Sequence, residues 1–224
     1  MQPACCVFMQ RIIGGGPWNF SKGEPSSNEK PVVLVSLFKT WLIGEDKSTI
    51  KSLKEKDMDI YEVIKKRRSV RSYKPDPVKE EKIHRLLEAA RLAPSAANRQ
   101  PLCFVVVKDE NTRLQLKKAY DEKWFYTAPL IICACYIPEK AWKRGDGKNY
   151  ADIDAVIAMD HLIMAATAEG LATCWIAAFK PQFVKSILNL PAGIEPVAMT
   201  PIGYPLEMPE PTYRKPLEEM VTFI

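Results

Sequence analysis

The sequence of 224 residues contains only two histidines, His84 and His161, and neither lies near a group of cysteines. Its six cysteines include no C-x-x-C pair, so the ligand spacing of a typical zinc site is missing. Cys133, Cys135 and Cys174 stand in apolar runs, where free thiols usually act as packing material in a reducing compartment. We therefore expect no metal site.

The motifs of enzymes that work without a cofactor, and those of nucleotide-binding proteins, are also missing. The sequence has no G-x-S-x-G nucleophile motif, no G-x-G-x-x-G dinucleotide motif and no Walker phosphate loop. Both histidines fall in helical patterns, away from any candidate nucleophile. If the protein is an enzyme, a cofactor must supply the reactive chemistry.

Neither a large excess of one charge nor a long hydrophobic run is present. The 32 basic and 27 acidic residues are interleaved and give a net charge of +5, which fits a small anionic ligand better than a nucleic acid. The apolar run at residues 31–43 is too short to cross a bilayer core of about 30 Å and contains Lys39. We expect no nucleic-acid or membrane partner and a cytoplasmic location.

Residues 1–57 differ in composition and residue pattern from the rest of the chain. They contain loop-forming glycines and prolines and a lysine-rich stretch, but no functional motif. At Met58 the pattern changes abruptly to MDIYEVIKK, in which Asp59 is suited to cap a helix. We predict a domain over residues 58–224, and we hypothesise that Met58 is the natural start and that residues 1–57 are an extension or an overlong gene model.

Helix and strand patterns follow one another from residue 59 onward, as in an α/β or α+β layered fold. The run at 130–137 is continuously apolar, which is typical of a buried central strand. The helical pattern at 151–170 is apolar on nearly every side, so a sheet or a second subunit must bury it. The expected helices are 59–66, 78–93, 112–121, 151–170 and 181–189, the expected strands are 102–107, 130–137, 171–176 and 194–204, and an extended tail runs from 205 to 224.

Two polar clusters stand out as candidate binding residues. Arg67, Arg68, Ser69 and Arg71 follow the first helix, and guanidinium and hydroxyl donors are suited to a phosphate monoester or to the carbonyl edge of a flat heterocycle. The plainer interpretation is a solvated helix end. The loop 94–101 (PSAANRQP) carries polar side chains on a backbone stiffened by a proline at each end, although it also fits a simple polar connection.

Two further clusters lie near the end of the chain. Trp175 and Ile176 end a predicted strand and are followed by Ala177 and Ala178, whose small side chains let a flat ring approach the backbone. Alternatively, Trp175 is simply a core residue. The tail carries Arg214 next to Lys215, and the plainer interpretation of this pair is solvated surface charge.

The order of these motifs resembles the nitroreductase family of FMN enzymes. The motifs are RRSVRSY after the first helix, LLEAARLAPSAANRQP, a long apolar helix ending in EGLATCWIAAF, then IGYP and a tail with RKPLEEMV. The resemblance runs from Met58 to the C-terminus. It implies an α+β, three-layer fold with a mostly antiparallel central sheet flanked by helices, and a domain-sharing homodimer with FMN at the subunit interface.

The resemblance also assigns roles to particular residues. Some relatives carry an acidic residue followed by glycine after the strand beside the flavin, but Ala177 and Ala178 stand there in this sequence, so a carboxylate role is absent. Arg71 is implied to stabilise the reduced flavin. The implied FMN ligands are Arg67, Arg68, Ser69, Arg71, Trp175, Ile176, Ala177, Arg214 and Lys215 of one subunit and Pro94, Ser95, Asn98 and Gln100 of the other.

The implied activity is that of an NAD(P)H-dependent flavin oxidoreductase with a ping-pong mechanism. NAD(P)H reduces FMN and leaves, and a small aromatic, quinone or nitro compound then accepts the electrons. Two alternatives stay open at this point. One is a specialised flavin enzyme of the same fold, such as a reductive dehalogenase or an oxidase, and the other is a module that binds or stores flavin without turnover.

Overall fold

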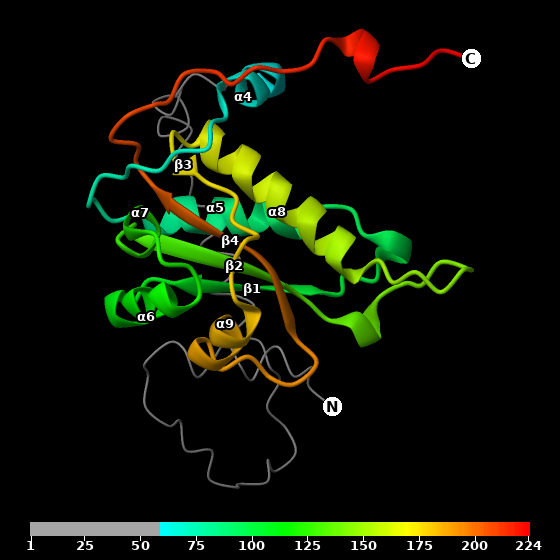
Figure 1. The fold of residues 1–224 in the computed structure, drawn as a ribbon, viewed down its shortest axis with the longest axis horizontal. Coiled ribbons are helices and arrows are strands. Elements are labelled where there is room, and N and C mark those ends of the chain that lie inside the picture. The colour runs from blue at the N-terminus through cyan, green and yellow to red at the C-terminus, as the bar shows by residue number, and fades with distance from the viewer. Residues whose placement is uncertain (1–58) are drawn as a thin grey trace, which may run out of the picture. The chain divides into compact units, whose positions relative to one another are not determined.

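The computed structural model of the chain describes residues 59–224 (Figure 1). Residues 1–57, predicted to be an extension, and Met58, the hypothesised start, lie outside the described residues. The described helices are α4 (Ile60–Lys66), α5 (Glu80–Arg91), η1 (Ala96–Asn98), α6 (Glu110–Gln115), η2 (Leu116–Lys118), α7 (Lys123–Tyr126), η3 (Pro138–Lys140), α8 (Ala151–Ala168), α9 (Pro181–Ile187) and η4 (Leu217–Glu219).

The described strands form one antiparallel sheet in the order β1-β2-β4-β3. The strands are β1 (Leu102–Val107), β2 (Leu130–Tyr136), β3 (Ala172–Thr173) and β4 (Glu195–Gly203). β2 lies between β1 and β4, so the continuously apolar run is an inner strand as predicted. The predicted α+β architecture is confirmed.

Both faces of the sheet are covered, which gives three layers. Leu130 and Ile132 of β2 pack in one buried cluster with Leu86 of α5 and Leu162 of α8. Because successive strand residues point to opposite faces, Cys133 and its odd-numbered neighbours face the other side, and they are fully buried as well. That face carries α9, which contacts β4. Figure 1 shows α8 and α9 on opposite sides of the strands.

The two long helices pack against each other at defined ends. Helix α8 begins where the Asn149 side chain accepts a hydrogen bond from the Ala151 N–H at 2.9 Å. It is capped by Glu169, and Gly170 follows with a left-handed φ of 71°, as its predicted C-terminal position requires. Arg85 in the middle of α5 donates to the Glu169 carboxylate at 2.5 Å, and Lys82 near the start of α5 donates to the Glu169 carbonyl oxygen. Beyond the other end of α5, the Ala96 N–H donates to Asp154 in the first turn of α8. The two helices therefore run antiparallel.

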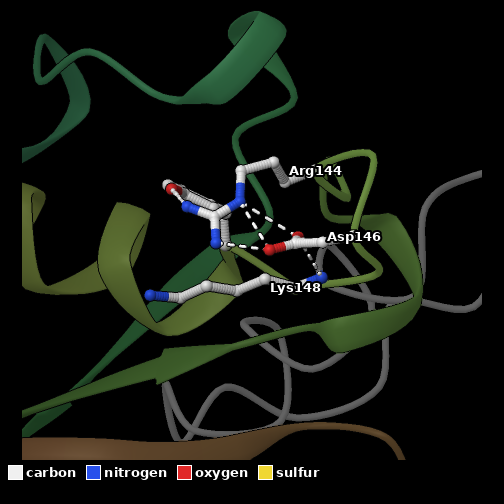
Figure 2. A network of polar contacts seen from close by, with 4 residues as sticks. Arg144, Asp146 and Lys148 are labelled. Atoms are coloured by element: carbon white, nitrogen blue, oxygen red, sulfur yellow. Dashed lines mark hydrogen bonds and ion pairs between the residues drawn. The ribbon is translucent and has the colours of Figure 1, made fainter.

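The connection that leads into α8 is held by a polar network. Figure 2 shows the Arg144 guanidinium bonded to the Asp146 carboxylate, which also accepts the Lys148 N–H at 3.1 Å. The closest Arg144–Asp146 approach is 2.5 Å, and Arg144 also donates to the Tyr150 hydroxyl at 3.1 Å. This network gives the exposed turn before α8 a defined shape.

Some predicted elements differ in length from the observed ones. The strand predicted over 171–176 is only the short β3. Its pairing with β4 is interrupted where the Cys174 N–H donates to the Thr200 hydroxyl, and it resumes only as the single bridge between Ile176 and Met199. The short helix α7 was not predicted. In the described part of the chain, no helix is long and apolar enough to cross a membrane.

Candidate functional site

The first polar cluster begins where α4 ends. Asp59 caps this helix by accepting the Tyr61 N–H at 3.2 Å, and the helix stops at Arg67. Arg68 folds back on the helix end and donates to the carbonyl oxygens of Lys65 at 2.5 Å and Arg67 at 2.9 Å. One nitrogen of Arg68 therefore complements the helix terminus, as the plainer interpretation expects.

A parallel bridge joins the first cluster to the Trp175 cluster. Ser69 lies beside Thr173, and the Val70 N–H donates to the Thr173 carbonyl at 2.9 Å. Cys174, which follows Thr173, is a buried thiol, and its burial raises its pKa. Val70 is buried in this arrangement, which leaves Ser69 half-buried and Arg71 exposed.

The segment after β3 presents alternate side chains to the surface. Ile176 exchanges two backbone hydrogen bonds with Met199 of β4, each of 2.9 Å, and its side chain is buried. Trp175 is 36% exposed and Ala177 is also exposed. Trp175 is therefore not a core residue in the single chain, and the alternative interpretation of it is wrong.

The tail closes a basic cavity of about 470 Å³ beside the first cluster. Its volume falls in the range of small-molecule sites, about 300–1,000 Å³. Arg214 lines it, whereas Lys215 does not and lies 3.9 Å from the Glu219 carboxylate instead. The lining residues are Ile64, Lys65, Arg67, Arg68, Ser69, Arg71, Pro209, Glu210, Pro211, Thr212 and Arg214.

The donors of this cavity fit a phosphate monoester. Four guanidinium groups, the Lys65 ammonium group and two hydroxyl groups line it, and the single carboxylate among the lining residues is Glu210. Guanidinium forks match phosphate oxygens in a bidentate fashion. The cavity is therefore suited to the phosphate end of an anionic cofactor.

The loop 94–101 has an unusual backbone. Ala97, Asn98 and Gln100 adopt left-handed φ angles of 50°, 52° and 49°, a region that residues other than glycine rarely occupy. The Ser95 hydroxyl accepts the Gln100 N–H at 3.0 Å, and the Gln100 side-chain amide donates to the Asn98 side-chain oxygen at 3.0 Å. Such strain is common where a ligand is held.

One chain does not bring this loop to the basic cavity. The Ala96 N–H donates to Asp154 in the first turns of α8, whereas Ser69 pairs with Thr173 just beyond the other end of that helix. At a rise of 1.5 Å per residue, α8 separates Asp154 from Ala168 by about 20 Å. Figure 1 shows β3 beside the C-terminal end of α8. The predicted site residues therefore form two groups.

Sequence reasoning missed Trp124, which lies beside Arg71, and Tyr120, which packs against Trp124. The guanidinium carbon of Arg71 lies 5.7 Å from the centre of the Trp124 ring, and Trp124 meets Tyr120 edge-on at 5.9 Å. Both aromatic residues belong to the short α6–α7 region, which carries no motif. The only available signal was the local density of aromatic residues in YDEKWFY at 120–126.

The covered antiparallel sheet and the arginine-lined cavity define a class of protein: an α+β protein with a cavity suited to a phosphate-bearing ligand. The model of the nitroreductase family matches residues 64–124 and 114–204. The chain belongs to this family.

The similarity of the chain to known proteins supports this assignment. A crystal structure of a nitroreductase family protein from Clostridium difficile 630 is 37% identical and superposes with a TM-score of 0.70, covering 74% of this chain and 98% of that one. An NADH dehydrogenase of Thermus thermophilus is 31% identical over 70% of this chain and 91% of its own length. The FMN reductase [NAD(P)H] of Bacillus subtilis is 29% identical over 70% of this chain and 71% of its own.

Membership of this family makes the protein an oxidoreductase with FMN as cofactor and NAD(P)H as electron donor. The residues present fit FMN, because the basic cavity provides donors for a phosphate and the adjacent segment 175–177 provides an exposed indole and a small side chain. The predicted family and fold are thus confirmed.

Proposed function

We propose that the protein reduces a small aromatic, quinone or nitro compound by a ping-pong reaction in a flavin site that two copies of the chain share. When bound, FMN accepts a hydride from NAD(P)H, which leaves, and it then passes the electrons to the acceptor. The observation that carries the proposal is the basic cavity, because the first cluster and the tail line it and the bridge between Ser69 and Thr173 ties the Trp175 segment to the first cluster.

The phosphate end of the site belongs to the cavity. Arg67 and Ser69 bind the phosphate and ribityl chain, with Arg68 contributing its remaining donors. Arg214 adds positive charge from the tail. Lys215 contributes less, since its ammonium group lies near Glu219 and outside the cavity lining.

The ring end of the site lies between Arg71 and the segment 175–177. Trp175, Ile176 and Ala177 pass over the isoalloxazine, and the small Ala177 allows close approach. Arg71 places a guanidinium at its pyrimidine edge, where a fixed positive charge stabilises the negative charge of the reduced state. Pro94, Ser95, Asn98 and Gln100 complete the site from the partner.

Exposed apolar surface supports the homodimer. A groove of about 550 Å³ runs along α4, α5 and α8, and its rim includes Ile60, Ile64 and Leu92, whose exposed fractions are 56%, 52% and 66%. Monomeric proteins rarely leave such a patch open. His161 also lines the groove. A second copy of the chain covers this groove and at the same time delivers its loop 94–101 to the cavity.

The domain boundary belongs to the same proposal. Residues 58–224 form the FMN-binding domain, since every cluster of the site lies within them. We also propose that Met58 is the natural start and that residues 1–57 are an extension or an overlong gene model. Mass spectrometry of the native protein tests this, because a mature peptide from before Met58 contradicts it.

The absorbance spectrum of freshly purified protein tests the proposed function. We expect bound yellow flavin that NAD(P)H bleaches without oxygen and that an added quinone or nitroaromatic compound restores. Flavin that NAD(P)H does not reduce indicates a storage module instead. Turnover only with a halogenated aromatic compound, or only with oxygen, indicates a dehalogenase or an oxidase. A protein without flavin contradicts the proposal.

A further inference from the structure

Asp154 is a buried carboxylate in the first turns of α8. Its side chain is 2% exposed, and its Oδ1 accepts the backbone N–H of Ala96 at 2.9 Å. Its second oxygen, Oδ2, is also buried and has no hydrogen-bond partner among the described residues. A buried carboxylate without full solvation is costly, so its one hydrogen bond is strongly favoured.

Asp152, two residues earlier, makes no such contact with another described part of the chain. Asp152 occupies the same first turn of α8 but is exposed, and its Oδ1 accepts the adjacent Ile153 N–H at 2.9 Å. Both carboxylates are favourably placed near the helix N-terminus. Asp154 alone reaches another element, and its partner Ala96 lies 58 positions earlier in the chain.

The segment that Asp154 holds is the strained loop 94–101. Ala96 begins the short helix η1, and the left-handed Ala97 and Asn98 follow it directly. Left-handed alanine costs about 1–3 kcal/mol and persists only where the surroundings hold it. Within the loop, Ser95 and Gln100 hydrogen-bond to each other, but Asp154 is the bond from η1 to the rigid helix.

We propose that Asp154 is a positioning residue that sets the conformation of loop 94–101, and through it the contacts that Ser95, Asn98 and Gln100 make with FMN in the partner's site. The inference rests on the proposed function, and it adds a residue that contacts neither cofactor nor substrate. Helix α8 is held in place by its packing against α5 and the sheet. The hydrogen bond from Ala96 to Asp154 therefore restrains the loop relative to a fixed helix.

Three variants of the full-length protein test this role. Asp154→Ala removes the acceptor, whereas Asp154→Asn keeps one oxygen that can accept the Ala96 N–H. Asp152→Ala is the matched control in the same turn. For each variant, the dissociation constant of FMN is measured by flavin fluorescence, and hydrogen exchange of the 94–101 backbone is measured in the FMN-free protein. Far-UV circular dichroism verifies the fold.

We expect Asp154→Ala to weaken FMN binding and to speed exchange in the loop, each by about tenfold or more, as for loss of a hydrogen bond to a charged group. Asp154→Asn should restore FMN binding to within about threefold of the wild type. Asp152→Ala should match the wild type. An Asp154→Ala protein with unchanged binding and exchange overturns the inference, and so does an Asp154→Asn protein as defective as Asp154→Ala.

The two measurements separate this inference from the proposed function. A wild-type protein that binds no FMN contradicts the proposed function. The exchange measurement then decides alone whether Asp154 fixes the loop, since it needs no flavin. Normal FMN binding with exchange unaffected by Asp154→Ala overturns the positioning role and leaves the proposed function intact.

Discussion

The Arg71 guanidinium lies over the face of Trp124, with its central carbon 5.7 Å from the ring centre. This contact holds a positive charge at the edge of the basic cavity. Arg71→Ala should lower the flavin reduction potential by about 30 mV, which equals about 1.4 kcal/mol for a two-electron couple. It should also slow reduction by NAD(P)H. Potentiometric titration and stopped-flow absorbance measure both effects.

Lys74→Ala is the matched control for Arg71→Ala. Lys74 is exposed three residues later and is not among the residues that line the cavity. Its removal should leave the potential and the reduction rate at their wild-type values. If Arg71→Ala behaves like Lys74→Ala, the electrostatic role of Arg71 is rejected.

The two basic residues of the tail should differ in their effect on FMN affinity. Arg214 lines the cavity, whereas Lys215 does not. Arg214→Ala should weaken FMN binding by about tenfold, as for loss of one charged hydrogen bond to the phosphate. Lys215→Ala should change it by less than about threefold. Equilibrium dialysis of the two variants decides, and equal losses would show that the tail acts only through its net charge.

Glu169 should make stability depend on pH. Hydrogen bonds from Arg85 hold the pKa of Glu169 below its usual value of 4.5. The ionised carboxylate therefore contributes stability above that pH, and the contribution is lost as pH falls through the lowered folded value. Glu169→Gln should cost about 1 kcal/mol at neutral pH, because the pair is partly exposed, and progressively less in acid. Urea unfolding of the FMN-free protein measures this difference.

Glu81→Gln is the control for the pH effect. Glu81 lies on the exposed side of α5 and forms no ion pair within the described residues. Its stability difference from the wild type should be small at every pH. A Glu169→Gln difference that stays constant across the acid range contradicts the linkage.

Gly203 permits a close approach between β4 and two neighbouring side chains. A Cβ at this position would lie 2.9 Å from Pro129 Cγ and 3.2 Å from Tyr73 Cδ1. Gly203→Ala should therefore destabilise the protein by about 1–3 kcal/mol. Gly145→Ala should change stability by less than about 0.5 kcal/mol, because nothing lies within 4 Å of the added carbon. Equal unfolding midpoints in urea would contradict this steric account.

The sequence predicted those helices and strands whose residue pattern lies within one continuous stretch of the chain. Helix α8 and strand β2 are long apolar runs, and the Asp59 cap and Gly170 terminus are local chemistry, so all were predictable. Strand β3 was predicted too long, because its backbone pairing with β4 breaks at Cys174, whose N–H donates to the Thr200 side chain of β4. That neighbour comes from a distant part of the chain.

In the candidate site, too, features that lie within one stretch of sequence were predictable, and contacts between distant segments were not. The basic cluster after α4 was visible because arginines stand together in the sequence. The bond between Ala96 and Asp154 was not visible, since two distant segments meet only in the folded chain. The left-handed alanine in η1 also defies local preference, because alanine disfavours that conformation and tertiary contacts impose it.

The most direct test of the shared site is a mixing experiment with two defective variants. Arg67→Glu damages the phosphate half of the site, and Asn98→Ala combined with Gln100→Ala damages the loop half. Neither variant alone should bind FMN tightly. If the halves come from different subunits, each mixed dimer has one site with both defects and one intact site, so mixing should restore FMN binding and NAD(P)H oxidation. If mixing under conditions of subunit exchange restores neither, the site lies within one chain and the account is wrong.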